Sequence, residues 1–82
     1  MSARVNHDTT ASVVLSLVRE LAGNPAVTTG DDLFELGFDS LMIVVLAARI
    51  QEQLDVELPI EVFFDAETIA DLVAATRTAG PA

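Results

Sequence analysis

The 82-residue sequence contains no cysteine, lysine, tryptophan or tyrosine, and its single histidine is His7. Without cysteine the chain can form no disulfide and no thiolate metal site, and it offers no thiol of its own to carry a thioester. With no lysine and one histidine near the N-terminus, it also lacks the usual bases that activate a nucleophile. We therefore expect no side chain of this protein to act as an activated nucleophile. Covalent chemistry on this chain would need groups brought by another protein or by a cofactor.

Long apolar runs are also absent. No run approaches the roughly 20 residues of a membrane-spanning helix, and the first eight residues lack the apolar core of a signal peptide. Apolar residues still make up 51% of the chain, which is enough for one domain with a single core. We expect a cytoplasmic protein with no membrane association.

Basic residues are few: four arginines stand against 13 acidic residues, and the net charge is -9. Such a surface repels DNA and RNA, so we expect protein partners with basic surfaces and no nucleic acid. Most of the acidic residues lie between Asp31 and Asp71, where Arg49 is the only basic residue. The second half of the chain is therefore expected to face partners, although an acidic surface can also serve solubility alone.

Hydrophobic spacing predicts helices and no strands. Apolar residues recur at helical spacing in three stretches, and a short fourth stretch follows Pro59, a residue that suits a first helical turn. Thr68 and Asp71 are spaced as in a capping box. We predict an all-α four-helix bundle with three longer helices and one short third helix, at residues 10–22, 39 or 40 to 54, 60–64 and 68–77.

A long segment without periodicity separates the first two predicted helices. It contains Leu33, Phe34, Leu36 and Phe38, which a free linker would not need, so we expect a loop pinned to the core with one helical turn at 32–36. For the whole chain we expect a flexible N-terminal tail at 1–8, a folded domain at 9–78 and a C-terminal tail at 79–82.

The second predicted helix is apolar on more than one side. Its buried stripe would consist of Ile43, Leu46, Ala47, Ile50 and Leu54. The opposite side carries Leu41, Val44 or Val45, and Ala48, where charges would be expected. Either this surface meets a partner, or Met42 and Val44 tuck under the loop and leave only Leu41 and Val45 outside.

Ser40, within Gly37-Phe38-Asp39-Ser40-Leu41, is the candidate site residue. A hydrolase nucleophile elbow needs Gly-x-Ser-x-Gly, whereas Met42 stands two positions after Ser40. Asp39 or Ser40 could simply cap the second helix. A phosphate on Ser40 would lie at the positive end of that helix, as either a cofactor linkage or a regulatory phosphoserine. The acidic residues at 31, 32 and 35 do not have the spacing of a calcium-binding loop, and no metal site is expected.

Over nearly its whole length the chain resembles the phosphopantetheine-dependent carrier proteins, the acyl carrier and peptidyl carrier family. The resemblance is carried by the segment from Asp32 to Leu41, by Leu58-Pro59 and by the segment from Phe63 to Ile69. It implies an acyl-carrier-protein-like fold and a non-catalytic role. It also implies that a phosphopantetheinyl transferase moves 4'-phosphopantetheine from coenzyme A onto Ser40, with Asp39 helping to position the transferase.

The resemblance further implies that the arm's thiol holds an acyl or aminoacyl group as a thioester. That group would be loaded by an adenylation enzyme or an acyltransferase and then used by downstream synthase enzymes. The family's docking surface corresponds here to Leu41, Val45, Arg49 and Glu52. Arg49 departs from the most acidic fatty-acid carriers, which points to specialised metabolism. We expect a monomer.

The type of pathway stays open. Phe38-Asp39 before the serine looks like polyketide-type carriers, whereas the stretch from Leu58 to Ile69 is equally similar to peptidyl carriers. The start at Met1 and the short tail after Arg77 suggest a discrete protein. The alternative function is an acidic helical interaction module without a cofactor, in which Ser40 is only a helix cap.

Overall fold

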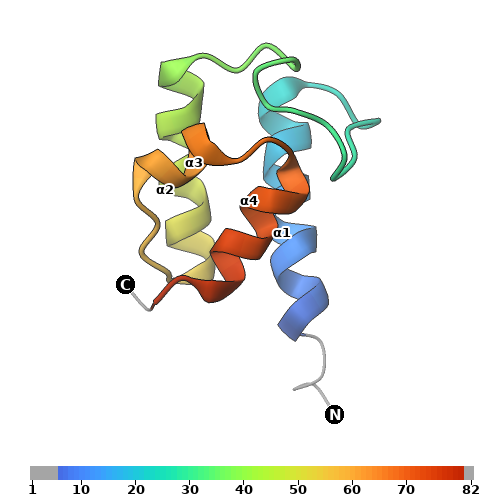
Figure 1. Ribbon diagram of the computed structural model, residues 1–82. Coiled ribbons are helices and arrows are strands. Elements are labelled where there is room, and N and C mark those ends of the chain that lie inside the picture. The colour runs from blue at the N-terminus through green and yellow to red at the C-terminus, as the bar shows by residue number, and fades with distance from the viewer. Residues whose placement is uncertain (1–5, 81–82) are drawn as a thin grey trace.

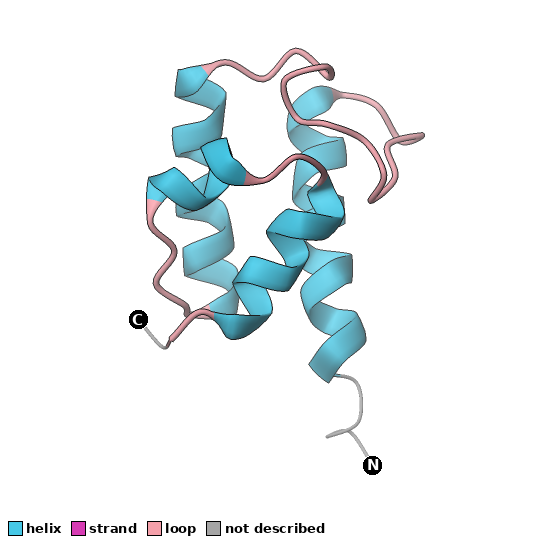
Figure 2. Cartoon of the chain, in the orientation of Figure 1, coloured by secondary structure: helices cyan, strands magenta, loops and turns pink. Residues whose placement is uncertain are grey.

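Four helices form the bundle: α1 (Asn6–Ala22), α2 (Ser40–Leu54), α3 (Ile60–Asp65) and α4 (Ile69–Thr78). The structure is a computed structural model that describes residues 6–80. Each of α1 and α3 packs on both α2 and α4. In Figure 1, α1 and α2 run side by side, and the short α3 lies against α2. Figure 2 shows helices joined by loops, without a strand in the part of the chain that the structure describes. The predicted all-α four-helix bundle is confirmed.

The helix bounds agree with the sequence prediction to within one residue, except at the start of α1. This helix begins at Asn6, four residues before the predicted start at Thr10. The prediction was wrong because hydrophobic spacing identifies the first residue that faces the core, whereas polar residues can extend a helix beyond the core. Of the tail expected at 1–8, residues 6–8 have helical backbone, and residues 1–5 lie outside the described residues.

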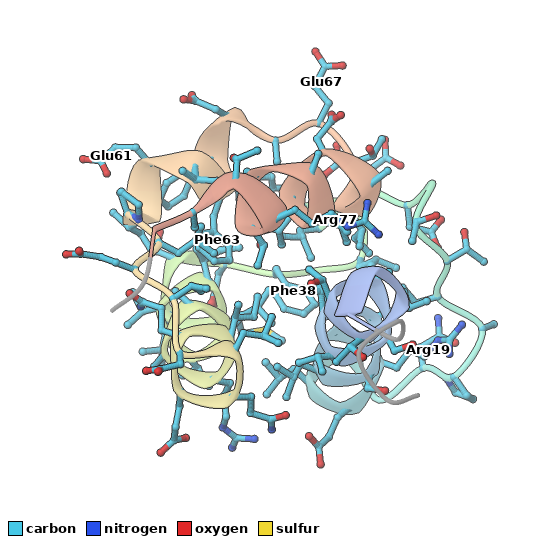
Figure 3. All side chains as sticks on the ribbon, turned by 90° about the horizontal axis from the view of Figure 1, so that it is seen from below. Arg19, Phe38, Glu61, Phe63, Glu67 and Arg77 are labelled. Atoms are coloured by element: carbon cyan, nitrogen blue, oxygen red, sulfur yellow. The ribbon has the colours of Figure 1, made fainter. Side chains whose placement is uncertain are left out.

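The core is built from side chains of all four helices. Ile43, Leu46, Ala47 and Ile50 of α2 are buried as predicted, and Leu54 packs against them at the edge. Figure 3 shows Phe38 and Phe63 among the side chains that fill the space between the helices. The side chains of this core that have no exposed surface are Val14, Val18, Ile43, Leu46, Ile50, Phe63, Ile69 and Leu72. The position of Ser40 is therefore set by a close-packed core.

The long loop between α1 and α2 is attached to the bundle, as predicted. Val27, Leu33 and Phe38 are buried, and the Arg19 Nε donates a hydrogen bond to the Val27 carbonyl at 2.9 Å. The predicted helical turn at 32–36 is present, because the Leu36 N–H donates to the Asp32 carbonyl at 3.0 Å.

The same loop also accepts hydrogen bonds from the free N–H groups at the start of α4. The carbonyls of Asp31 and Thr29 accept hydrogen bonds from the N–H groups of Ile69 and Ala70, at 2.9 and 2.8 Å. These N–H groups belong to a first helical turn and have no acceptor within their own helix. The predicted capping box of Thr68 is also present. The loop before α2 is thus held by backbone hydrogen bonds to α4.

Candidate functional site

Ser40 is the first residue of α2, and its side chain is exposed. The residue before it, Asp39, is the N-cap: its backbone is extended, and its Oδ1 accepts a hydrogen bond from the Met42 N–H at 2.9 Å. The Asp39 carbonyl also accepts the first intrahelical hydrogen bond, from the Ile43 N–H. Of the two predicted candidates for the cap, Asp39 is the one that acts. The Ser40 hydroxyl is therefore not used to cap the helix.

The Leu-Gly-Phe segment before the site makes a tight turn between two buried anchors. Leu33 and Phe38 are both buried, and the Phe38 N–H donates to the Leu33 carbonyl at 3.1 Å. Inside this turn Gly37 has φ +99°, a conformation that residues with a Cβ rarely adopt. The turn fixes the direction in which the chain enters α2. Ser40 is consequently presented outward from a rigid support.

The backbone around Ser40 has spare hydrogen-bond donors. The first four N–H groups of a helix lack intrahelical acceptors, and at α2 the Asp39 side chain satisfies that of Met42. Within residues 6–80 no acceptor is present for the N–H groups of Ser40 and Leu41. These donors and the positive end of the helix dipole suit an anion linked to the Ser40 hydroxyl. The site therefore fits a phosphodiester at Ser40.

Nothing at the site makes the Ser40 hydroxyl a nucleophile. Among the described residues no side chain hydrogen-bonds to its Oγ. The neighbouring carboxylate of Asp39 is engaged by the Met42 N–H instead. The arrangement offers a hydroxyl for modification by another protein and lacks the nucleophile and base pair of a hydrolase.

The predicted docking residues all lie on α2, but they do not form one patch with Ser40. The Leu41 side chain is 71% exposed, Val45 is partly buried, and Arg49 and Glu52 are exposed. Arg49 lies nine positions after Ser40, which is half a turn round the helix. Its guanidinium is 3.7 Å from the Glu20 carboxylate of α1. Arg49 therefore faces α1, on the side of α2 away from Ser40.

The exposure of Val44 on the outer face of α2 does not agree with the alternative in which the loop covers this residue. Val44 is 53% exposed, whereas Met42 is partly buried against the core. The alternative in which Val44 tucks under the loop is therefore wrong. Leu41 and Val44 together leave an apolar surface beside Ser40.

Sequence reasoning missed a contact between the loop and α3. The rings of Phe34 and Phe64 stack with their centroids 5.9 Å apart and an angle of 21° between their planes. Phe63 is fully buried, whereas its neighbour Phe64 is 46% exposed. What the sequence did not reveal is that Phe34, thirty positions earlier, supplies the partner ring.

The loop carboxylates at 31 and 32 shape the backbone. The Asp31 Oδ2 accepts the Thr28 N–H at 2.8 Å, and the Asp32 Oδ1 accepts the Phe34 N–H at 2.8 Å. Within the described residues no group of three or more potential metal ligands gathers. No helix in that part of the chain has the length and apolar character needed to cross a bilayer.

Comparison with known proteins places this geometry in context. The family model described as "Phosphopantetheine attachment site" matches residues 12–76, which include the turn, Ser40 and all of α2 and α3. No solved structure gives a significant match to the chain.

Curated relatives come from two kinds of synthase. The chain is 36% identical over 61 residues to surfactin synthase subunit 3 of Bacillus subtilis, covering 74% of the chain. It is 32% identical over 84 residues to phosphinothricin tripeptide synthetase PhsB of Streptomyces viridochromogenes, covering 99% of the chain. It is 33% identical over 69 residues to the non-reducing polyketide synthase aoiG of Aspergillus oryzae, covering 82% of the chain. The chain spans only 5%, 7% and 3% of these proteins, respectively.

Proposed function

The chain belongs to the phosphopantetheine attachment-site family, whose members are non-catalytic carriers with covalently attached 4'-phosphopantetheine, and we propose that its attachment residue is Ser40. The carrier unit is the folded domain at 9–78. One observation supports Ser40 above all: it is an exposed hydroxyl at the first position of α2, and the capping role that would otherwise explain a serine there is filled by Asp39.

Attachment breaks the phosphoanhydride bond of coenzyme A and forms a phosphodiester between Ser40 and pantetheine. The Ser40 Oγ forms a bond to the phosphorus that carries the pantetheine of coenzyme A, the bond from that phosphorus to the remaining nucleotide breaks, and the hydroxyl proton is released. Because Ser40 has no base of its own, the phosphopantetheinyl transferase supplies it. Asp39 then has two roles, as the cap of α2 and as a contact for the transferase.

The chain's own residues hold the product in place. The Ser40 and Leu41 N–H groups and the helix dipole stabilise the negative charge of the phosphodiester. The cofactor supplies a terminal thiol that carries an acyl or aminoacyl group as a thioester. The domain keeps this group at high local concentration near partner enzymes, an effect of tethering.

The partners are the transferase, a loading enzyme and downstream enzymes of polyketide or nonribosomal peptide synthesis. Relatives of both kinds, each a much longer synthase, support this proposal. Leu41, Val45 and Glu52 are proposed docking residues on α2, with Arg49 at the edge facing α1. The acidic surface favours basic partner surfaces and should make docking weaker at high salt.

The test is the intact mass of the protein after incubation with coenzyme A, magnesium and a promiscuous phosphopantetheinyl transferase. We expect a gain of one phosphopantetheine in the parent chain and none in Ser40→Ala. Ser16→Ala is the matched control, because Ser16 is also an exposed serine on a helix. A folded parent chain that gains no mass, or a Ser40→Ala variant that does, would contradict the proposal.

A further inference from the structure

Four large apolar side chains are exposed among the described residues, namely Phe34, Leu41, Val44 and Phe64. Leu41 and Val44 lie in the first two turns of α2, after Ser40. Phe34 lies in the turn before α2, and Phe64 stacks on it from α3. Single exposed apolar residues are common, but contiguous apolar surface usually marks a contact with something else. The two rings differ from the aliphatic pair in being held together across two elements.

The stacked pair is a preformed aromatic surface. Phe34 and Phe64 are 44% and 46% exposed, and the near-parallel arrangement of their rings can extend to a third planar group. Hydrogen bonds from the Phe34 N–H to Asp32 and from the Gly37 N–H to the Phe34 carbonyl fix the backbone on one side. On the α3 side, the buried Phe63 side chain fixes the backbone next to Phe64. An aromatic ring that packs on this pair therefore contacts side chains that need not be ordered first.

The pair lies within reach of a group attached to Ser40. The hydrogen bond from the Gly37 N–H to the Phe34 carbonyl, at 3.1 Å, closes a turn in which the two Cα atoms are within about 7 Å. From Gly37 to Ser40 the chain can extend at most about 11 Å, so Phe34 and Ser40 are at most about 18 Å apart. A phosphopantetheine arm has roughly fourteen chain bonds, equivalent to about 16 Å of extended polypeptide. The arm and its cargo together can therefore reach the rings.

The charge around the rings discriminates between kinds of cargo. The residues that follow Phe34 and Phe64 in the chain are Glu35 and Asp65, both exposed. The only basic residue between positions 31 and 71, Arg49, lies on the α1 side of α2, close to a carboxylate. A cargo with a free carboxylate would be repelled there. A cargo with an α-ammonium group would be attracted.

We propose that the Phe34–Phe64 stack binds the aromatic side chain of an aminoacyl group carried on the Ser40 arm, an inference that rests on Ser40 being the attachment residue. Two half-exposed phenylalanine rings offer roughly 200 Å², far less than the roughly 800 Å² per partner of a standard protein interface. A small contact area can be enough for a tethered cargo, because a short flexible arm gives an effective concentration in the millimolar range. A contact too weak to recruit a partner is still occupied part of the time by a tethered group.

The experiment uses four cargoes that differ by one group at a time. Non-hydrolysable amide analogues of phenylalanyl-, 3-phenylpropionyl-, alanyl- and propionyl-coenzyme A are attached to the nitrogen-15-labelled full chain by a promiscuous transferase. Backbone amide shifts are recorded at about pH 6.5, where an α-amino group is largely protonated. We expect ring-bearing cargoes to shift the amides of residues 34, 35, 64 and 65, and ring-free cargoes to leave them near their values with the bare arm. The phenylalanyl cargo should give the larger shift of the two ring-bearing ones, and salt should reduce that difference.

Variants on both sides of the stack test the contact. Phe34→Leu and Phe64→Leu keep an apolar side chain but remove a ring, and each should lower the cargo-dependent shift at least twofold. Val44→Ala is the matched control, an exposed apolar residue near Ser40 but on α2, and should leave the shift unchanged. Equal shifts from ring-bearing and ring-free cargoes, or an equal loss in Val44→Ala, would overturn the inference. A larger shift from phenylpropionyl than from phenylalanyl would overturn the aminoacyl assignment.

The two proposals fail in different ways. Intact mass is measured first, and a folded chain without added mass would overturn both the attachment at Ser40 and the contact that depends on it. Full mass gain without a ring-dependent shift would overturn only the contact at Phe34 and Phe64.

Discussion

Replacing Asp39 by alanine tests how the start of α2 is held. The Asp39 Oδ1 accepts the Met42 N–H at 2.9 Å, and loss of such a cap costs about 0.5–2 kcal/mol of unfolding free energy. The negative charge at the positive end of the helix adds about 0.3–1 kcal/mol, and exposure of Asp39 to solvent favours the lower part of that range. We therefore expect a total loss of about 1–2 kcal/mol.

The assay is urea denaturation followed by far-ultraviolet circular dichroism. A domain of this size has a stability of about 4–12 kcal/mol, so the variant should remain folded. With an m-value near the lower end for small proteins, about 1 kcal/mol per molar urea, the midpoint should fall by roughly 1–2 M. The slope should stay constant, because the cap changes little of the surface that unfolding exposes.

Asp39→Asn is the control that separates the hydrogen bond from the charge. Asparagine keeps an oxygen acceptor at the cap, so it should restore most of the lost stability. If Asp39 also contacts the transferase through its charge, attachment to the asparagine variant should be slower although its stability is close to that of the parent. A midpoint in Asp39→Ala equal to that of the parent, or equal destabilisation by asparagine and alanine, would refute the capping argument.

Three further substitutions have clear expected effects on the urea midpoint. Gly37→Ala should lower the free energy of unfolding by about 1–3 kcal/mol through backbone strain alone, since φ is +99° and no atom lies within 4 Å of the added Cβ. Gly30→Ala is the control, because Gly30 has no positive φ, and it should change the midpoint little. Equal effects of the two substitutions would contradict this reasoning. Thr68→Ala should cost about 1 kcal/mol by removing the capping box of α4, and Thr68→Ser should recover most of it; no recovery would show that the hydroxyl is not what matters. Phe63→Ala should lower the free energy of unfolding by about 3–5 kcal/mol because Phe63 has no exposed surface, whereas Phe64→Ala should cost much less. The reversed order would contradict the argument from burial.

The start of α2 shows how far local sequence information extends. The turn residues, the Asp-Ser pair and the hydrophobic spacing that followed placed a helix start at 39 or 40 and its end at Leu54, and the structure agrees. The sequence could not choose between Asp39 and Ser40 as the cap, because both residue types cap helices well. The choice depends on backbone geometry: the buried anchors of the preceding turn leave Asp39 in the extended conformation that an N-cap requires.

Arg49 shows where position along a helix is not enough. Its place on α2 suggested a docking residue beside Leu41, yet the structure brings it to Glu20 of α1. Which way an exposed long side chain turns depends on the charges that a neighbouring helix places near it. Nothing within the sequence of α2 contains that information.

The sequence by itself determined the type of fold, three of the four helix starts, the buried stripe of α2 and the candidate attachment serine. These features depend on spacing over a few residues, such as helical periodicity, capping pairs and turn residues, which can be read from the chain alone. Only the tertiary structure decided that the loop carbonyls of Thr29 and Asp31 close the start of α4, and that Phe34 meets Phe64 at the surface. Those contacts join residues thirty or more positions apart, and they exist only because helix packing sets the distance between segments that local patterns leave independent.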